Sequence, residues 1–178
     1  MPDGTLVRLA AVRQADSAAM FGWINNRELV LLSAPYRPVG EDAHRHWFDS
    51  VQKRSDNALF CIRLIADDQL IGTCQLVGVD RIHRSAGLQI RIGAAPMRRR
   101  GYGTEAVRLL VRHGFNDLNL HRIELGVFAH NEAALRAYEK AGFVVEGCRR
   151  EAVWIDGRFC DLVLMALLKS QWHDGAHV

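Results

Sequence analysis

Three arginines and two glycines stand together at the predicted start of a helix. The run Arg98-Arg99-Arg100-Gly101-Tyr102-Gly103 follows an apolar segment at 88–93, and a helix-forming stretch begins at Thr104. Glycine lets backbone N–H groups approach a ligand closely, and a helix N-terminus carries partial positive charge. The arginines add full positive charges. The pattern R-x-x-G-x-G therefore predicts a site for a diphosphate, although a solvated basic turn is the plain alternative.

A second pair of residues with useful chemistry lies on the next predicted helix. Asn131 suits the cap of a helix that runs to about residue 141, where Gly142 would end it. Tyr138 lies two turns after Asn131, so both side chains are predicted to face one extended ligand. A phenol has a pKa of about 10 and stays protonated at neutral pH, which suits a proton donor. Capping alone would also explain Asn131, and ordinary packing would explain Tyr138.

Together with Gly142-Phe143, these motifs resemble the CoA-binding core of the GNAT N-acetyltransferases over about residues 70–168. The resemblance implies acetyl-CoA as co-substrate, no metal, and direct transfer to an amine in a ternary complex. It implies that the strand edge at Ile90, Arg91 and Ile92 binds the pantetheine arm. It further implies that the loop from Arg98 to Thr104 binds the diphosphate, that Asn131 hydrogen-bonds the arm, and that Tyr138 protonates the departing thiolate.

The general base is harder to assign. Many members of the family, including polyamine enzymes, carry a glutamate near the start of the strand before the loop, and this chain has Gly87 there. That difference puts a polyamine acceptor and a direct carboxylate base in doubt. Glu124 on the neighbouring strand is a candidate base acting through water, and a salt bridge at the strand end explains it equally well. Weaker candidates are Glu28, Asp49, Glu151 and Asp156.

Two other functional patterns fit less well. The spacing Gly101-x-Gly103-x-x-Ala106 also satisfies a loose dinucleotide fingerprint, with Glu124 as the ribose acid. In that fold the strand runs directly into the first glycine, whereas here residues 94–100 intervene. His44 and His46 would face different sides of a helix, so we expect both to be exposed and predict no zinc site.

Composition favours one globular domain over residues 1–178, because 49% of the residues are hydrophobic. The net charge of +3 is explained by the loop arginines, so no nucleic-acid partner is expected. Cys61, Cys74, Cys148 and Cys160 show no C-x-x-C spacing, which favours free thiols and a cytoplasmic protein. Apolar runs stay well short of the ~18 residues of a membrane span, so no membrane association is expected.

Hydrophobic periodicity predicts an α+β fold. The expected sheet is mixed and mostly antiparallel, with one parallel strand pair. The resemblance to the GNAT family implies that this pair is splayed and that helices cover both faces of the sheet. An Asp-Gly pair at 156–157 indicates a final hairpin. The expected strands are 6–12, 59–65, 70–79, 85–92, 122–128, 144–154 and 162–168, and the expected helices are 16–24, 41–53, 104–118 and 131–141.

The segment 149–165 resembles the branch of the family that contains ribosomal-protein N-terminal, spermidine and aminoglycoside acetyltransferases. We therefore expect the acceptor to be a primary amine of a small aminated metabolite, an aminoglycoside or a polyamine, bound between residues 20–47 and the turn near Asp156. A protein N-terminus is the alternative acceptor, and a non-catalytic acyl-CoA sensor is the alternative function. Exposed edge strands make a homodimer reasonable.

Overall fold

A single mixed sheet forms the centre of the computed structural model, which describes residues 3–173. The strand order is β1-β2-β3-β4-β5-β7-β6, and every neighbouring pair is antiparallel except β4 and β5. This arrangement confirms the α+β fold expected from the sequence. The strands are β1 Val7–Ala10, β2 Asn57–Leu64, β3 Leu70–Asp80, β4 Ser85–Ile92, β5 Arg122–Phe128, β6 Val144–Ile155 and β7 Arg158–Leu168.

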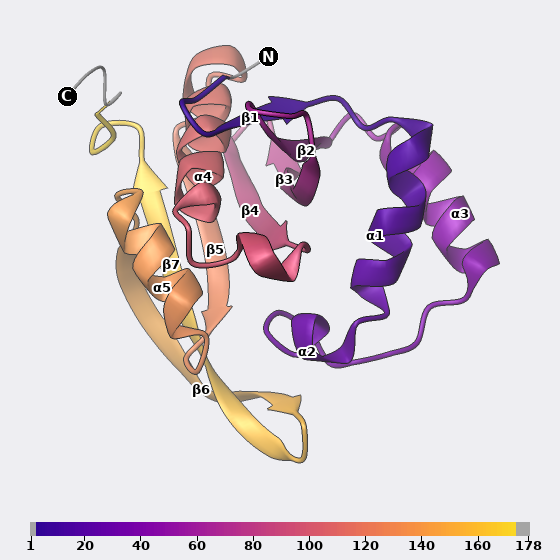
Figure 1. Cartoon of the computed structure of the whole chain (residues 1–178). Coiled ribbons are helices and arrows are strands. Elements are labelled where there is room, and N and C mark those ends of the chain that lie inside the picture. The colour runs from indigo at the N-terminus through magenta and orange to yellow at the C-terminus, as the bar shows by residue number, and fades with distance from the viewer. Residues whose placement is uncertain (1–2, 174–178) are drawn as a thin grey trace.

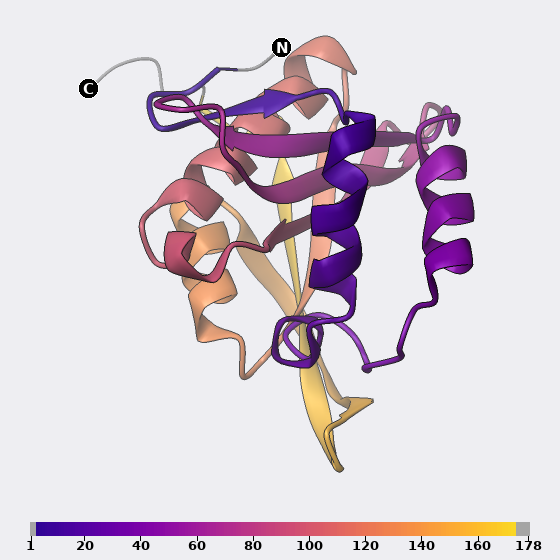
Figure 2. The ribbon, with the colours of Figure 1, turned by 45° about the vertical axis from the view of Figure 1, so that its right-hand side comes forward.

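Helices cover both faces of this sheet (Figures 1 and 2). One face carries α4 and α5, and the opposite face carries α1, α2 and α3. The main helices are α1 Ser17–Ile24, α2 Arg27–Val30, α3 Glu41–Val51, α4 Tyr102–Arg112 and α5 Glu132–Lys140, and the short helices are η1 Gln14–Asp16, η2 Ala95–Met97 and η3 His113–Asp117. In the described part of the chain, every helix is too short or too polar to cross a membrane.

The parallel pair in the middle of the sheet is short. β4 and β5 pair only at Ser85 with Arg122, Ala86 with Ile123 and Gly87 with Glu124. Beyond these pairs, β4 stays bonded to β3 and β5 stays bonded to β7, so the two strands part from each other. The facing backbone groups of the parted segments are therefore free to bind a ligand.

The core lies between the sheet and the helix α4. Alternating residues of the strands point to this face, and they pack against one apolar side of the helix. The side chains that fill it include Ile62, Leu76, Leu88, Ile123 and Met165 from the sheet and Val107, Leu110 and Phe115 from α4 and the turn after it. This packing fixes the start of α4 next to the end of β4.

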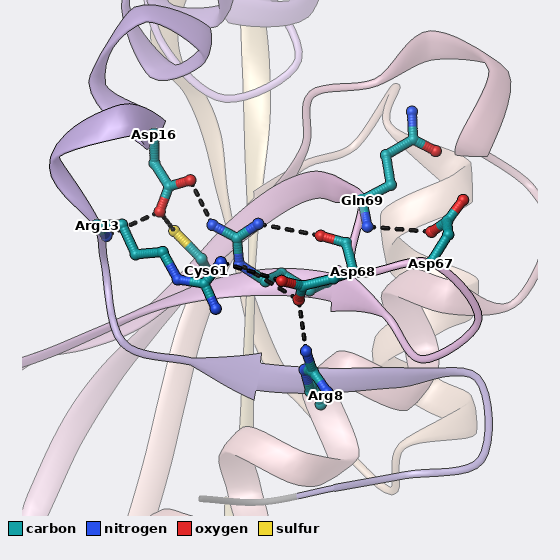
Figure 3. A network of polar contacts seen from close by, with 8 residues as sticks. Arg8, Arg13, Asp16, Cys61, Asp67, Asp68 and Gln69 are labelled. Atoms are coloured by element: carbon teal, nitrogen blue, oxygen red, sulfur yellow. Dashed lines mark hydrogen bonds and ion pairs between the residues drawn. The ribbon is translucent and has the colours of Figure 1, made fainter.

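A buried polar network attaches the opposite layer to the sheet (Figure 3). The Asp16 carboxylate, just before α1, accepts hydrogen bonds from Arg13 N at 2.8 Å, from Cys61 Sγ at 3.2 Å and from the Arg63 guanidinium. Asp16 and Arg63 are only 4% and 5% exposed. Asp68, in the β2–β3 turn, accepts from Arg8 Nη2 at 2.6 Å and Arg13 Nη1 at 3.0 Å. The entry to α1 is thereby held against β1 and β2.

Several expected boundaries were wrong. The first strand is shorter than 6–12, and α4 ends at Arg112, after which the chain forms a wider π-type turn at His113–Asp117. The short helix α2 was not expected. The last hairpin is longer than expected because Asp156 and Gly157, with φ of 50° and 80°, form a two-residue turn that lets both strands continue to it.

Candidate active site

One cleft of about 1250 Å³ opens where β4 and β5 part. On one side it is lined by the loop before α4 and by α5, and we call this the α4–α5 side. On the other it is lined by α1, the segment after α2, α3 and the outward-facing residues of β3 and β4, and we call this the α1–α3 side. The cleft thus connects two differently built surfaces through the gap between the strands.

The start of α4 faces the cleft. Gly101 caps the helix with φ of 87°, a left-handed conformation that favours glycine, and its carbonyl accepts from Glu105 N at 3.0 Å. The N–H groups in the first turn, from Tyr102 to Thr104, therefore have no carbonyl one turn earlier in the helix to bind. Gly103 lies against the end of β4, since a Cβ there would be in ordinary van der Waals contact with Ile92 Cγ1 at 3.5 Å. The geometry suits an anion.

The three arginines of this loop differ in position. Arg98 donates from Nε to Ile92 O at 3.1 Å and from Nη2 to Gly93 O at 3.3 Å, so its side chain ties the loop to the end of β4. Arg98 and Arg99 line the cleft, together with Gly101, Gly103 and Thr104. Arg100 and Tyr102 lie outside the lining.

Asn131 and Tyr138 both line the cleft from α5. Asn131 caps the helix, because its Oδ1 accepts from Ala134 N at 3.2 Å, while its Nδ2 donates to Leu32 O at 3.1 Å. Tyr138 is 7% exposed, and its ring lies 5.9 Å from that of Phe143. Burial raises the pKa of Tyr138 to about 12, so the phenol keeps its proton at neutral pH.

The sequence comparisons agree with this geometry. Residues 7–144 match the model of the acetyltransferase (GNAT) domain family. The chain belongs to this family. It is an acetyl-CoA-dependent N-acetyltransferase, and acetyl-CoA is its co-substrate.

Similar proteins support the assignment of this GNAT enzyme over nearly the whole chain. The spermidine N(1)-acetyltransferase of Vibrio cholerae is 31% identical over 169 residues, which cover 92% of this chain and 94% of that protein. A crystal structure of spermidine N-acetyltransferase from Vibrio cholerae in complex with CoA and spermine has a TM-score of 0.86 at 29% identity, covering 93% and 96% of the two chains. A dodecameric structure of that enzyme in an intermediate state has a TM-score of 0.79 at 30% identity, covering 92% and 94%.

Glu124 lies apart from the cleft of this GNAT enzyme. It lines a smaller neighbouring pocket of about 350 Å³ and accepts a hydrogen bond from Arg122 Nε at 2.8 Å. Arg122 also donates from Nη1 to Glu146 Oε1 at 2.8 Å. The two pockets share Leu88, Gln89 and Gly126, so only a short stretch of β4 and β5 separates Glu124 from the main cleft.

The α1–α3 side contains site residues that sequence reasoning missed. His44 was expected to be exposed, and this was wrong: it is 6% exposed and lines the cleft. Its position at i, i+4 and i+7 with Phe48 and Val51 was the available signal, since this spacing places His44 on the apolar face of α3. Its Nε2 lies 3.0 Å from Ser17 O. Ser17 Oγ lies 3.2 Å from the same Nε2. A tautomer with its proton on Nε2 would donate to the Ser17 carbonyl and would have its lone pair on Nδ1.

In the described range 3–173, no group of three or more His, Cys, Asp or Glu side chains is arranged to hold a metal ion.

Proposed function

We propose that this GNAT enzyme acetylates the primary amine of a small metabolite by direct attack of the amine on acetyl-CoA in a ternary complex. The observation that carries the proposal is the single cleft that joins the α4–α5 side to the α1–α3 side through the parted strands. A cofactor on one side and an acceptor on the other would meet in that gap, which converts a bimolecular reaction into one between held partners.

The proposed cofactor path follows the free backbone groups. The diphosphate would bind the first-turn amides of α4 between Gly101 and Thr104, where Arg99 lines the cleft. The pantetheine arm would run along the edge of β4 at Ile90, Arg91 and Ile92, whose backbone faces the gap left by β5. Arg98 would act by holding the loop, because its guanidinium bonds the carbonyls at the end of β4.

Tyr138 is the proposed proton donor to the departing thiolate of CoA. Its side chain lines the cleft from α5, and its raised pKa keeps the phenol protonated throughout the neutral range. The proposed role of Asn131 is to orient the cofactor arm through the amide proton that remains after its bond to Leu32 O.

Two side chains are proposed to receive the proton of the acceptor ammonium. Glu124 would act through water from the neighbouring pocket and would have to remain paired with Arg122. His44 would act from inside the cleft through Nδ1. Replacing each by glutamine and recording pH–rate profiles separates them, because a lost base depresses the rate most at low pH, where little free amine exists. A profile that matches the parent removes that residue from the mechanism.

An acceptor screen tests the proposed function directly. Purified protein with acetyl-CoA is offered polyamines, aminoglycosides, amino sugars and N-terminal peptides, and CoA thiol release is measured together with product mass. We expect a mass increase of one acetyl group on a small amine. Acetylation confined to peptide N-termini would instead support the N-terminal acetyltransferase alternative. Hydrolysis of acetyl-CoA without any acetylated product would contradict the proposal.

We also propose that the enzyme works as a homo-oligomer in the cytoplasm. The edge strand β6 and its hairpin partner expose large apolar side chains, among them Val144, Val145, Trp154 and Phe159, and a self-complementary contact would cover them. The dodecameric Vibrio cholerae structure shows that a relative assembles from many copies. The four free thiols suit a reducing compartment. Light scattering measures the oligomeric state, and a monomer at all protein concentrations would contradict the proposed homo-oligomer.

A further inference from the structure

The charged side chains that line the cleft are unevenly distributed. On the α4–α5 side lie Arg98, Arg99 and Arg136 with Glu132, which pairs with Arg136 at 3.0 Å. On the α1–α3 side, the permanently charged side chain is Arg91 of β4. The other polar side chains on that side carry no permanent charge and include Ser33, His44, Thr73, Gln75 and Gln89. Among the described lining residues of the α1–α3 side there is no carboxylate.

The alternation of β4 places the Arg91 side chain on the α1–α3 side. Ile90 and Ile92 pack against the core under α4, so the residue between them points to the opposite face. There Arg91 lies in register with Thr73 of β3, and its Nη2 donates to Ser33 Oγ at 3.4 Å. The backbone of this stretch is the proposed contact for the pantetheine arm, so the Arg91 side chain would stand beside that arm on the α1–α3 side.

The hydrogen-bonding capacity of Arg91 is largely unused. A guanidinium carries five N–H donors in a planar fork that fits a carboxylate, and Arg91 makes one long hydrogen bond to a neutral hydroxyl. Within residues 3–173, no carboxylate lies within ion-pair distance of it. Burial lowers the pKa of Arg91, which means that its charge is poorly solvated. A bound anion would compensate this loss of solvation.

We propose that the acceptor is a small primary amine that also carries a carboxylate, and that the Arg91 guanidinium binds this carboxylate on the α1–α3 side of the cleft. The proposal rests on the acetyl transfer proposed above and narrows its acceptor class.

The same arrangement disfavours a polycationic acceptor. Spermidine would bring further ammonium groups next to Arg91, and like charges at short distance repel each other. Carboxylates that could compensate are missing from the described lining of the α1–α3 side, and Gly87 supplies no side chain at the start of β4. The acceptor of this chain is thus expected to differ from the one named for its spermidine-acetylating relatives.

A matched series of acceptors tests the proposal. Glycine, 3-aminopropanoate, 4-aminobutanoate and 6-aminohexanoate are compared with the diamines of the same chain lengths and with spermidine. Thiol release is measured for the parent enzyme, for Arg91→Met, which keeps the apolar stem, and for Arg91→Lys, which keeps the charge. Calorimetry on the CoA-loaded proteins measures acceptor binding without turnover, and melting temperatures confirm that each variant folds.

We expect at least one aminocarboxylate to be used ten-fold or more efficiently than its matched diamine. In Arg91→Met its KM should rise at least ten-fold and its calorimetric signal should disappear, with partial recovery in Arg91→Lys. The affinity for CoA itself should stay unchanged, which separates this role from cofactor binding.

Equal use of diamines, or a preference that Arg91→Met leaves unchanged, would overturn the acceptor class while leaving acetyl transfer intact. If no amine is acetylated, the proposed transfer to small amines fails. In that case, calorimetry without turnover still tests whether Arg91 binds a carboxylate. Binding of an aminocarboxylate that Arg91→Met abolishes supports it, and an absence of binding overturns it.

Discussion

Trp23 of α1 lies directly over Gly93, just beyond the end of β4. A Cβ at Gly93 would fall 2.0 Å from Trp23 Cδ2, far inside contact distance, so the indole occupies space that only glycine leaves open. Gly93 O also accepts from Arg98 Nη2. The α1–α3 side of the cleft and the loop before α4 therefore meet at one glycine.

Gly93→Ala should force the indole of Trp23 out of place and lower the free energy of unfolding by about 1–3 kcal/mol, as overpacking does in other proteins. In a Trp23→Ala background the same substitution should cost less than about 0.5 kcal/mol, because the clash is gone. Urea unfolding of the parent, the two single variants and the double variant measures the coupling free energy between Gly93 and Trp23. If Gly93→Ala lowers the free energy of unfolding equally with and without the Trp23 side chain, the position of the indole does not depend on Gly93.

Gly101→Ala should weaken CoA binding by about ten-fold, or 1.4 kcal/mol, because the left-handed cap of α4 becomes strained and its amides shift. Gly157→Ala is the matched control, since Gly157 also has a positive φ, of 80°, and open space around it, in a turn far along the chain. Both variants should lose a similar amount of stability. Calorimetry should detect weaker CoA binding only for Gly101→Ala, and unchanged affinity in that variant would refute the anion cradle.

Tyr138→Phe should lower kcat by about 10²–10⁴-fold with little change in stability, because the hydroxyl matters where charge gathers on sulfur. Asn131→Ala should behave differently. It removes the bonds to Ala134 N and Leu32 O, so we expect a raised KM for acetyl-CoA and a stability loss of about 1 kcal/mol. Steady-state kinetics under conditions where chemistry limits the rate distinguish the two. Full kcat in Tyr138→Phe would make Tyr138 a packing residue.

Asp16→Asn should lower the free energy of unfolding at pH 7 by about 3–5 kcal/mol, because it leaves Arg63 buried without its partner. Burial raises the pKa of Asp16, but hydrogen bonds from Arg13 N, Arg63 and Cys61 outweigh it, and the pKa in the folded protein lies below its ordinary value. The stabilisation is thus complete above about pH 4 and is lost as the pH falls through the folded-state pKa.

Urea unfolding as a function of pH checks this prediction. The difference in stability between the parent and Asp16→Asn should shrink on acidification. Asp42→Asn is the control, since Asp42 is 84% exposed in its pair with Arg45 and should change stability by less than about 1 kcal/mol at any pH. A difference that stays constant down to pH 2 would mean that Asp16 titrates normally.

The sequence was most informative where local chemistry decides the structure. The bounds of β4 and β5 and a helix start beside the glycine pair were predicted correctly, because strand alternation and helix-forming composition are local properties. The salt bridge of Glu124 was one of its two open interpretations, and its partner Arg122 lies two residues away on the same strand. The burial of His44 was missed although its spacing with Phe48 and Val51 places it on the apolar face of α3. The bonds from Arg98 to backbone carbonyls depend on the path of the loop. Composition and spacing carry no signal for the path of a loop.

Only three residue pairs join β4 to β5, so the sheet consists of two halves with a short connection between them. One half contains β1 to β4, the other contains β5, β7 and β6, and the cleft lies across the seam. A molecule bound in the seam takes the place of absent strand-to-strand hydrogen bonds, and so it works as an added strand that braces the two halves. Acetyl-CoA at about 100 times its Kd would then add about 2.7 kcal/mol to the stability of the entire fold.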